Sequence, residues 1–204
     1  MITLILPISN EQGFENLRKS LFNLSTDLDK RSNLLVVCYD KDIYLKARDY
    51  LTEYQHIGEW RVIYSEKKNL LATLDYLGSD EYIFIWNEKV LLLQGAMINL
   101  YRQYLDRTNA GFISGQIDIP VPYWIKDIYA DKVQLIKSDK RQPNEWGEID
   151  VAYPFCMMTK KDHFTNYFFT KSRSKLAFGL ALRRAGFQNY LNKQSRCKYK
   201  AEVE

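Results

Sequence analysis

A polar triplet that follows a wholly apolar segment is the strongest chemical signal in this sequence. Residues 82–86 read Tyr-Ile-Phe-Ile-Trp and are followed by Asn87, Glu88 and Lys89. An apolar run with no polar face is typical of a parallel strand that is buried on both sides. Because ligands of such sheets bind where the strands end, we expect Asn87 and Glu88 to lie in a binding site. The alternative for Glu88 is an ordinary solvated loop acid.

Polar residues also follow two earlier predicted strands. Asn10 and Glu11 come shortly after the strand predicted at Thr3–Leu6, and Asp40 comes shortly after Leu34–Cys38. At the same sheet edge these side chains could contact a bound ligand. Each also has a plainer interpretation, since Asn10 and Glu11 can cap a helix and Asp40 can form a turn or a helix cap.

Three candidates come from the second half of the chain. Asp150 stands in a predicted strand, where a buried and unpaired carboxylate would be costly, so its presence favours a functional role. Trp124 and Trp146 lie in a stretch broken up by prolines, residues 118–146, where their rings could stack on a sugar or a base. Aromatic residues in such loops also serve as packing anchors.

The elements that must position these residues alternate between strand and helix. Apolar runs predict strands, and apolar residues three and four apart predict amphipathic helices between them. This order predicts an α/β fold, a sandwich of helices around a mainly parallel central sheet. The expected strands are residues 3–6, 34–38, 61–64 and 82–86, and the expected helices carry the apolar positions of residues 14–24, 44–54, 70–77 and 97–104.

After residue 117 the pattern changes. A strand at residues 111–117 is followed by the proline-rich stretch, which we expect to be a loop region with a strand or two. A strand at 151–158 and a helix at 174–185 complete the chain. Gly186 is the expected stop of that helix, and Arg183 in its last turn complements the helix C-terminus.

The composition limits the class of protein. The chain has 204 residues, 46% of them apolar, which suits one domain with a proper core. The start of the chain lacks the pattern of a secretory signal, and no apolar run approaches the roughly 20 residues needed to span a bilayer. Three widely spaced cysteines indicate reduced thiols, so we expect a cytoplasmic protein. The two histidines form no zinc pattern.

The net charge of +4 is partly concentrated near the C-terminus. Lys193, Arg196, Lys198 and Lys200 fall within eight residues. We interpret residues 193–204 as a solvated, frayed tail, with contact to an anionic lipid or nucleic acid surface as the alternative. The sequence leaves a homo-oligomer open.

The order of the segments resembles the family-2 glycosyltransferases of the GT-A fold. Each segment is loose by itself, but the ordered set covers nearly the whole chain. The matching segments are Ile-Leu-Pro-Ile-Ser-Asn-Glu at residues 5–11, Leu-Val-Val-Cys-Tyr-Asp at 35–40, Glu-Tyr-Ile-Phe-Ile-Trp-Asn-Glu at 81–88, Phe-Ile-Ser-Gly-Gln at 112–116, Glu-Ile-Asp-Val at 148–151 and the helix from residue 176.

This resemblance implies a function and roles for individual residues. Such enzymes move a sugar from a nucleotide-diphospho-sugar, most often a UDP-sugar, to an acceptor hydroxyl, and family-2 members usually invert the sugar carbon. It implies a nucleotide-sugar-binding half at residues 1–117, an acceptor half at 118–192 and a cofactor that is Mg²⁺ or Mn²⁺. The implied nucleotide-binding residues are Pro7, Asn10, Glu11, Asp40 and Asn69; the metal site has Glu88 and Asn87; the acceptor site has Trp124 and Trp146; the catalytic pair is Asp150 and Lys175.

The chain departs from the family pattern at four sites. Cys38 and Tyr39 stand where the family has a pair of acids at the base-binding position, and Leu70 and Leu71 stand where a glycine is expected after Asn69. The other two departures concern the metal motif and the catalytic base. Trp86-Asn87-Glu88 stands where the family has its Asp-x-Asp metal motif, which leaves one carboxylate there. Ser174-Lys175 stands where the family has an acidic pair as its catalytic base, so Asp150 is the remaining candidate base. Lys175 could instead neutralise a leaving diphosphate, because an ammonium serves as a point charge for phosphate.

These observations leave two classes of function open and weaken a third. One is an active glycosyltransferase, and the other is a catalytically degenerate relative that serves as a nucleotide-binding or protein-partner module. The missing carboxylates favour the second class, whereas the polar strand ends and Asp150 favour the first. A nucleotidyltransferase is disfavoured because the glycine-rich and basic phosphate loop of that class is absent near the N-terminus.

Overall fold

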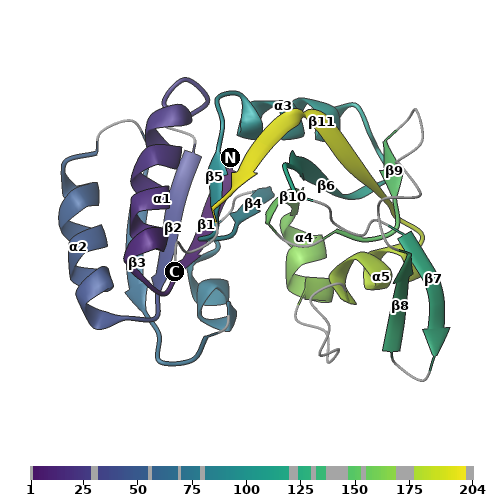
Figure 1. Ribbon diagram of the computed structural model, residues 1–204, viewed down its shortest axis with the longest axis horizontal. Helices are drawn as coiled ribbons and strands as arrows, with labels where there is room; N and C mark the ends of the chain where they lie inside the picture. Colours follow the sequence, from purple (N-terminus) through teal and green to yellow (C-terminus); the bar gives the residue numbers. More distant parts are fainter. Residues whose placement is uncertain are drawn as a thin grey trace.

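The protein is described by a computed structural model in which strands and helices alternate along the first half of the chain (Figure 1). The described residues are 2–28, 32–54, 57–68, 70–78, 81–119, 124–129, 132–136, 147–152, 155–168 and 177–200. The strands are β1 (Ile2–Ile8), β2 (Ser32–Cys38), β3 (Trp60–Tyr64), β4 (Tyr82–Trp86), β5 (Val90–Leu92), β6 (Ala110–Ile117), β7 (Trp124–Tyr129), β8 (Lys132–Ile136), β9 (Glu148–Ile149), β10 (Cys156–Lys160) and β11 (Gln188–Tyr199). The helices are α1 (Glu11–Asn23), α2 (Lys41–Thr52), the 3₁₀ helix η1 (Leu71–Tyr76), α3 (Ala96–Leu105), α4 (Lys161–His163), the π-helix η3 (Phe164–Phe168) and α5 (Ala177–Arg184).

A nine-stranded sheet forms the centre of the protein. Its strands follow the order β3-β2-β1-β4-β10-β6-β11-β5, and β9 pairs with the start of β11, at the opposite end from β5. The first four are mutually parallel, and β6 and β11 share their direction, so six of the nine strands run the same way. The remaining three, β10, β5 and β9, run antiparallel to their neighbours. The predicted α/β fold with a mainly parallel sheet is confirmed.

Helices cover both faces of this sheet, which makes a three-layer sandwich. Successive residues of a strand point to opposite faces, and in β1 Leu4 and Leu6 enter one apolar cluster while Ile5 enters the other. The first cluster is closed by α1, α2 and α3, and the second by η1, η3 and α5. Figure 1 shows α1 and α2 beside the N-terminal strands and α5 beside the C-terminal half.

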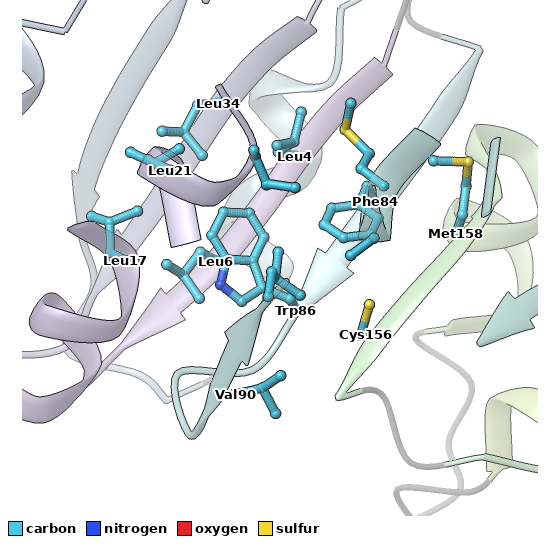
Figure 2. Packing of buried hydrophobic residues seen from close by; sticks show 14 of the residues in the cluster. Leu4, Leu6, Leu17, Leu21, Leu34, Phe84, Trp86, Val90, Cys156 and Met158 are labelled. Carbon is cyan, nitrogen blue, oxygen red and sulfur yellow. The ribbon is translucent and has the colours of Figure 1, made fainter. Parts of the chain in front are cut away.

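Trp86, the last residue of β4, lies in the middle of the first cluster. Its side chain is fully buried, and its ring centroid is 5.8 Å from that of Phe84. Figure 2 shows the indole beside Leu6 and beneath the helix that carries Leu17. The position that would carry the first acid of an Asp-x-Asp motif therefore points into the core in this chain.

Three local predictions need correction. The helix expected around residues 70–77 is the short η1, because its first turn has no side-chain cap and Leu71 faces solvent with half of its surface exposed. The strand expected at 151–158 starts only at Cys156, where β10 pairs with β4 and β6 together. The final helix is α5 at Ala177–Arg184, and residues 169–176, which include its expected start, lie outside the described part.

The expected frayed C-terminal tail is also wrong, because residues 188–199 form β11, the longest strand. In this strand Ser195 and Cys197 are buried while Arg196 and Lys198 are exposed. That alternation is typical of a strand with one solvated face. The high density of basic residues suggested a solvated tail. The residues between them are buried, however, and the segment pairs as a strand of the central sheet.

Other expectations are confirmed in part. The strands β7 and β8 form an antiparallel pair in the stretch where a strand or two was expected. The three cysteines are free and buried, as predicted for core thiols. Within the described ranges, no helix combines the length and apolar character needed to cross a bilayer.

Truncation of the buried indole should be costly. We expect Trp86→Ala to lower the free energy of unfolding by about 3–5 kcal/mol, because it leaves a large cavity in a close-packed core. Phe22→Ala is the matched control, since Phe22 lies on α1 with 78% of its surface exposed and should change stability by less than about 0.5 kcal/mol. Urea denaturation of both variants measures the difference. Equal effects would contradict the packing described for Trp86.

Candidate functional site

The candidate site lies at the edge where β1, β2 and β4 end. These strands are parallel and adjacent, and Ile8 at the end of β1 is in register with Cys38 at the end of β2. The backbone N–H of Tyr39 donates to the carbonyl oxygen of Ile8 at 2.9 Å, which extends the pairing beyond the strands. The segments that follow the three strands therefore meet at one edge, as the sequence predicted.

Glu88 is the centre of this edge. Its Oε2 accepts the backbone N–H of Ser9 at 2.5 Å, and its Oε1 accepts the hydroxyl of Ser9 at 2.6 Å. Both oxygens of the carboxylate are thus bound by one residue of the loop between β1 and α1. Hydrogen bonds to an ionised acceptor are about twice as strong as neutral ones. Glu88 therefore ties the turn after β4 to the loop after β1.

The first turn of α1 lies close against this carboxylate. A Cβ placed on Gly13 would come within 2.7 Å of Glu88 Oε2 and 2.9 Å of Ile8 Cγ2, so the absence of a side chain allows the approach. One turn further along α1, the buried amide of Asn16 donates from Nδ2 to the backbone carbonyl of Glu88 at 2.7 Å. The helix therefore binds the backbone of Glu88 through Asn16 and leaves room for its side chain at Gly13.

Asn87 forms a tight turn between β4 and β5. Its Oδ1 accepts the backbone N–H of Lys89 at 2.9 Å, and its carbonyl oxygen accepts the N–H of Val90 at 3.0 Å. The N–H of Asn87 donates to the carbonyl oxygen of Phe155 at 2.8 Å, which holds the turn against the segment before β10. Asn87 and Glu88 are both half-buried. The amide of Asn87 is therefore engaged in shaping the turn that presents Glu88.

The other polar residues at the edge act as helix caps. Asn10 Oδ1 accepts the N–H of Gly13 at 2.9 Å and caps α1. Asp40 Oδ1 accepts the N–H groups of Asp42 and Ile43 at 2.9 and 3.0 Å and caps α2. The plainer interpretation of Asn10 and Asp40 thus accounts for these contacts.

Glu11 and Pro7 also lie at this edge. The carboxylate of Glu11 forms an exposed ion pair with Lys46 of α2 at 2.7 Å. Pro7 lies within β1, in register with Val37 of β2. All the predicted nucleotide-binding residues that the structure describes are therefore brought together along β1, β2 and the starts of α1 and α2.

Tyr39 senses the charge at this edge. The pKa of its phenol is raised to about 12, chiefly by burial and to a smaller extent by the negative charge of Glu88. A phenol with so high a pKa stays neutral at physiological pH and can donate a hydrogen bond there. The base-binding position where the family resemblance implied acids therefore holds a neutral aromatic side chain beside Asp40.

Asp150 lies apart from this edge. It follows β9, and β10, β6 and β11 lie between β4 and β9 in the order of the sheet. Its carboxylate lies 3.7 Å from Arg183 Nε, and the two side chains are 25% and 38% exposed. Its carbonyl oxygen accepts the buried amide of Asn189 at 2.8 Å. The structure thus pairs the candidate base with a guanidinium of α5.

Several predicted site residues cannot be placed beside the others. Asn69, Trp146 and Lys175 lie outside the described residues. Trp124 begins β7, which pairs with β8 in a separate two-stranded sheet. The implied acceptor site and the implied charge of Lys175 therefore stay predictions.

The described residues do not build a metal site by themselves. Mg²⁺ demands six oxygen ligands in a near-octahedral arrangement. Both Glu88 oxygens already accept hydrogen bonds from Ser9, Trp86 points into the core, and the part of the chain that the structure describes contains no group of three acidic, histidine or cysteine side chains able to hold an ion. A divalent cation at this edge would depend chiefly on ligands from a bound phosphate.

Sequence reasoning missed the residues that organise the site. Ser9 and Asn16 both contact Glu88 from more than 70 positions away, and nothing in a single sequence pairs residues so distant. Arg183 could be placed in the last turn of a helix, but its ion pair with Asp150 depends on how α5 packs against β9. A signal did exist for Gly13, since a glycine inside a predicted helix often marks a close approach.

Comparisons with known proteins support the fold. No family model matches this chain, and no curated protein matches it. Among solved structures it is similar to the mannosyltransferase PcManGT from Pyrobaculum calidifontis, which was determined in complex with GDP-Man and Mn²⁺. The TM-score is 0.68 at 11% sequence identity, and the match covers 100% of this chain and 57% of that enzyme. The chain thus has a GT-A-like glycosyltransferase fold and spans little more than half the length of that enzyme.

Removal of the Ser9 hydroxyl should weaken the site measurably. We expect Ser9→Ala to lower the free energy of unfolding by about 1–3 kcal/mol, because a half-buried carboxylate oxygen loses its donor. Ser65→Ala is the matched control, since the Ser65 hydroxyl makes only a local, exposed bond to the carbonyl oxygen of Lys67. Urea denaturation distinguishes the two, and a change in Ser9→Ala as small as in the control would rule out a stabilising role for this contact.

Proposed function

We propose that this protein is a nucleotide-sugar-dependent glycosyltransferase that binds its donor where β1, β2 and β4 end. Two observations support the proposal. The fold is shared with a mannosyltransferase bound to GDP-Man, and the polar segments that follow three parallel strands converge on one edge. The convergence carries the argument, because open parallel sheets bind ligands at that edge. A UDP-sugar is our first choice of donor.

The proposed reaction is a direct displacement. An oxygen of the acceptor hydroxyl attacks the anomeric carbon of the sugar while the bond from that carbon to the diphosphate oxygen breaks. The nucleoside diphosphate leaves with the electron pair, and the hydroxyl proton passes to a carboxylate, for which we propose Asp150. Attack from the side opposite the leaving group inverts the sugar carbon.

The remaining residues have binding roles in this proposal. The base and ribose would contact Pro7, Asn10, Glu11, Asp40 and Asn69. Asn87 and Glu88 would lie beside the diphosphate, and Lys175 would neutralise the charge that develops on it. Trp124 and Trp146 would line the acceptor. A divalent cation, Mg²⁺ or Mn²⁺, would be held chiefly through the diphosphate, because the described residues offer no complete set of metal ligands.

A catalytically degenerate module is the second candidate, and one observation favours it. Glu88 is bound to Ser9 through both oxygens, and Asp150 lies beside Arg183, so the two carboxylates nearest to the implied chemistry already have partners. A relative that retains the fold but binds a nucleotide or a protein would need neither carboxylate free. Turnover of a donor to free nucleoside diphosphate distinguishes the candidates.

Nucleotide binding should be visible as thermal stabilisation. We expect one of UDP, GDP and CDP, or one of their sugars, to raise the melting temperature by about 5–10 °C at 100 times its dissociation constant, since a ligand of the folded state stabilises it by mass action. Each ligand is tested with and without Mn²⁺. A shift with one nucleotide, followed by its release from the matching sugar donor, supports the transferase. No shift with any ligand would favour the partner module.

The proposed role of Lys175 gives a second test. Lys175→Ala should abolish turnover of the donor identified by the thermal screen, because a positive charge beside the leaving diphosphate is lost. Lys19→Ala is the matched control, since it removes the same charge from the exposed side of α1. Initial rates of nucleoside diphosphate release measure both variants. Wild-type rates in Lys175→Ala would refute this role.

A further inference from the structure

The last part of β11 carries a row of cations on one face. Cys197 is buried and Tyr199 packs on the same apolar cluster, so the alternating residues Arg196, Lys198 and Lys200 lie on the opposite face. All three are exposed. The spacing of about 6.6 Å between alternate residues of a strand places neighbouring charges within reach of a single small anion.

This row ends beside the turn that carries Asn87 and Glu88. Lys198 is in register with Leu91 of β5, and the N–H of Lys200 donates to the carbonyl oxygen of Lys89 at 2.7 Å. Lys89 directly follows Glu88 and is itself exposed. Figure 1 shows the end of β11 alongside β5. The chain thus brings cations from residues 89 and 196–200 together next to the proposed donor edge, although about 110 residues separate them in sequence.

The charges in this region are not balanced by ion pairs. Across the ranges that the structure describes, Lys89, Arg196, Lys198 and Lys200 form no ion pair. Among the described residues, Asp118 contacts the row directly, since its Oδ1 accepts the N–H of Tyr199 at 2.6 Å. Glu88 lies in the neighbouring turn, and its oxygens are bound by Ser9. The region therefore carries an excess of positive charge.

We propose that Lys89, Lys198 and Lys200 bind the diphosphate group of the donor and supply the positive charge that a divalent cation would otherwise provide. The inference rests on the proposed donor site and names the positive charges that would bind the diphosphate there. A diphosphate carries two to three negative charges at neutral pH, and the three ammonium groups match them as point charges. Binding of the donor is then independent of Mg²⁺ and Mn²⁺.

Continuity with the donor edge favours a diphosphate over a membrane or a nucleic acid. The cations lie next to Asn87 and Glu88, at the strand ends where the ligands of this fold class bind. Among the residues that the structure describes, this edge has no group of three acidic, histidine or cysteine side chains that could hold a metal ion, and Trp86 is buried in the core. The diphosphate therefore needs positive charge at the same place where the structure has lysine side chains without an ion-pair partner among the described residues.

The test uses inorganic pyrophosphate and the nucleoside diphosphates UDP, GDP and CDP, titrated calorimetrically into the full chain in the presence of EDTA. We expect the wild type to bind pyrophosphate without a metal. The double variant Lys198→Gln/Lys200→Gln should bind it about tenfold more weakly, since two exposed charge-assisted contacts are lost. Lys198→Arg/Lys200→Arg retains both charges and should restore most of the affinity. Added NaCl should weaken binding by screening the charges.

Lys193→Gln is the matched control. It removes the same charge from the same strand, but Lys193 lies within the irregular stretch between Asn192 and Arg196, before the residues of β11 that pair with β5. Its pyrophosphate affinity should equal that of the wild type. Equal loss in Lys193→Gln and in the double variant would overturn the proposal, because it would indicate a general effect of net charge. Melting temperatures check that every variant is folded.

The outcomes separate this inference from the proposed function. Donor turnover that requires Mn²⁺ and is unchanged in Lys198→Gln/Lys200→Gln would overturn the inference while the transferase stands. If pyrophosphate binding depends on the two lysines but no sugar donor is turned over, the diphosphate site is supported and the transferase activity is not. Loss of binding to phosphatidylserine vesicles or single-stranded DNA in the double variant, with pyrophosphate affinity unchanged, would assign the row to that surface and overturn the inference.

Discussion

The two hydrogen bonds between Ser9 and Glu88 are the interaction on which the candidate site depends. They join the loop after β1 to the turn after β4 and occupy both oxygens of the carboxylate. The contact is possible because the two strands are parallel neighbours and because Gly13 leaves room for the side chain. With Asn16 holding its carbonyl oxygen, Glu88 is fixed from two sides. The acid at the sheet edge acts first as a connection between loops, and any ligand must bind around it.

That arrangement changes the electrostatics expected of such a fold. When a metal motif contributes two carboxylates, the cation they hold faces the diphosphate. In the segment of this chain that resembles such a motif, Trp86 packs in the core and Glu88 is held by Ser9. A diphosphate brought to this edge still needs compensating charge. The end of β11 supplies it with ammonium groups, which need no preformed ligand cage.

The sequence predicted the first half of the fold well because its signals are local. The apolar run of β4 and the capping side chains Asn10 and Asp40 each depend on residues within a few positions, and each is found where expected. The strand ends therefore met at the predicted edge. The β11 strand was missed because its identity depends on pairing with β5 and β6, which lie far away in sequence. Because many of its residues are basic, the alternation of buried and exposed positions typical of a strand is not recognisable in its sequence. The alternation is seen only in the structure, where Ser195 and Cys197 are buried.

The same difference explains which site residues could be found. A strand end marks where chemistry is located, but the partner of each side chain there is set by tertiary packing. Glu88 could be singled out, whereas its engagement with Ser9 could not, and Asp150 could be singled out without its neighbour Arg183. The cluster of cations from the turn before β5 and from the end of β11 likewise depends on tertiary packing. The sequence of a motif shows how many carboxylates the motif carries. It does not show the positive charge that a distant strand brings to the same edge of the sheet. The absence of acids from a motif is therefore weak evidence that the motif's anion is no longer bound.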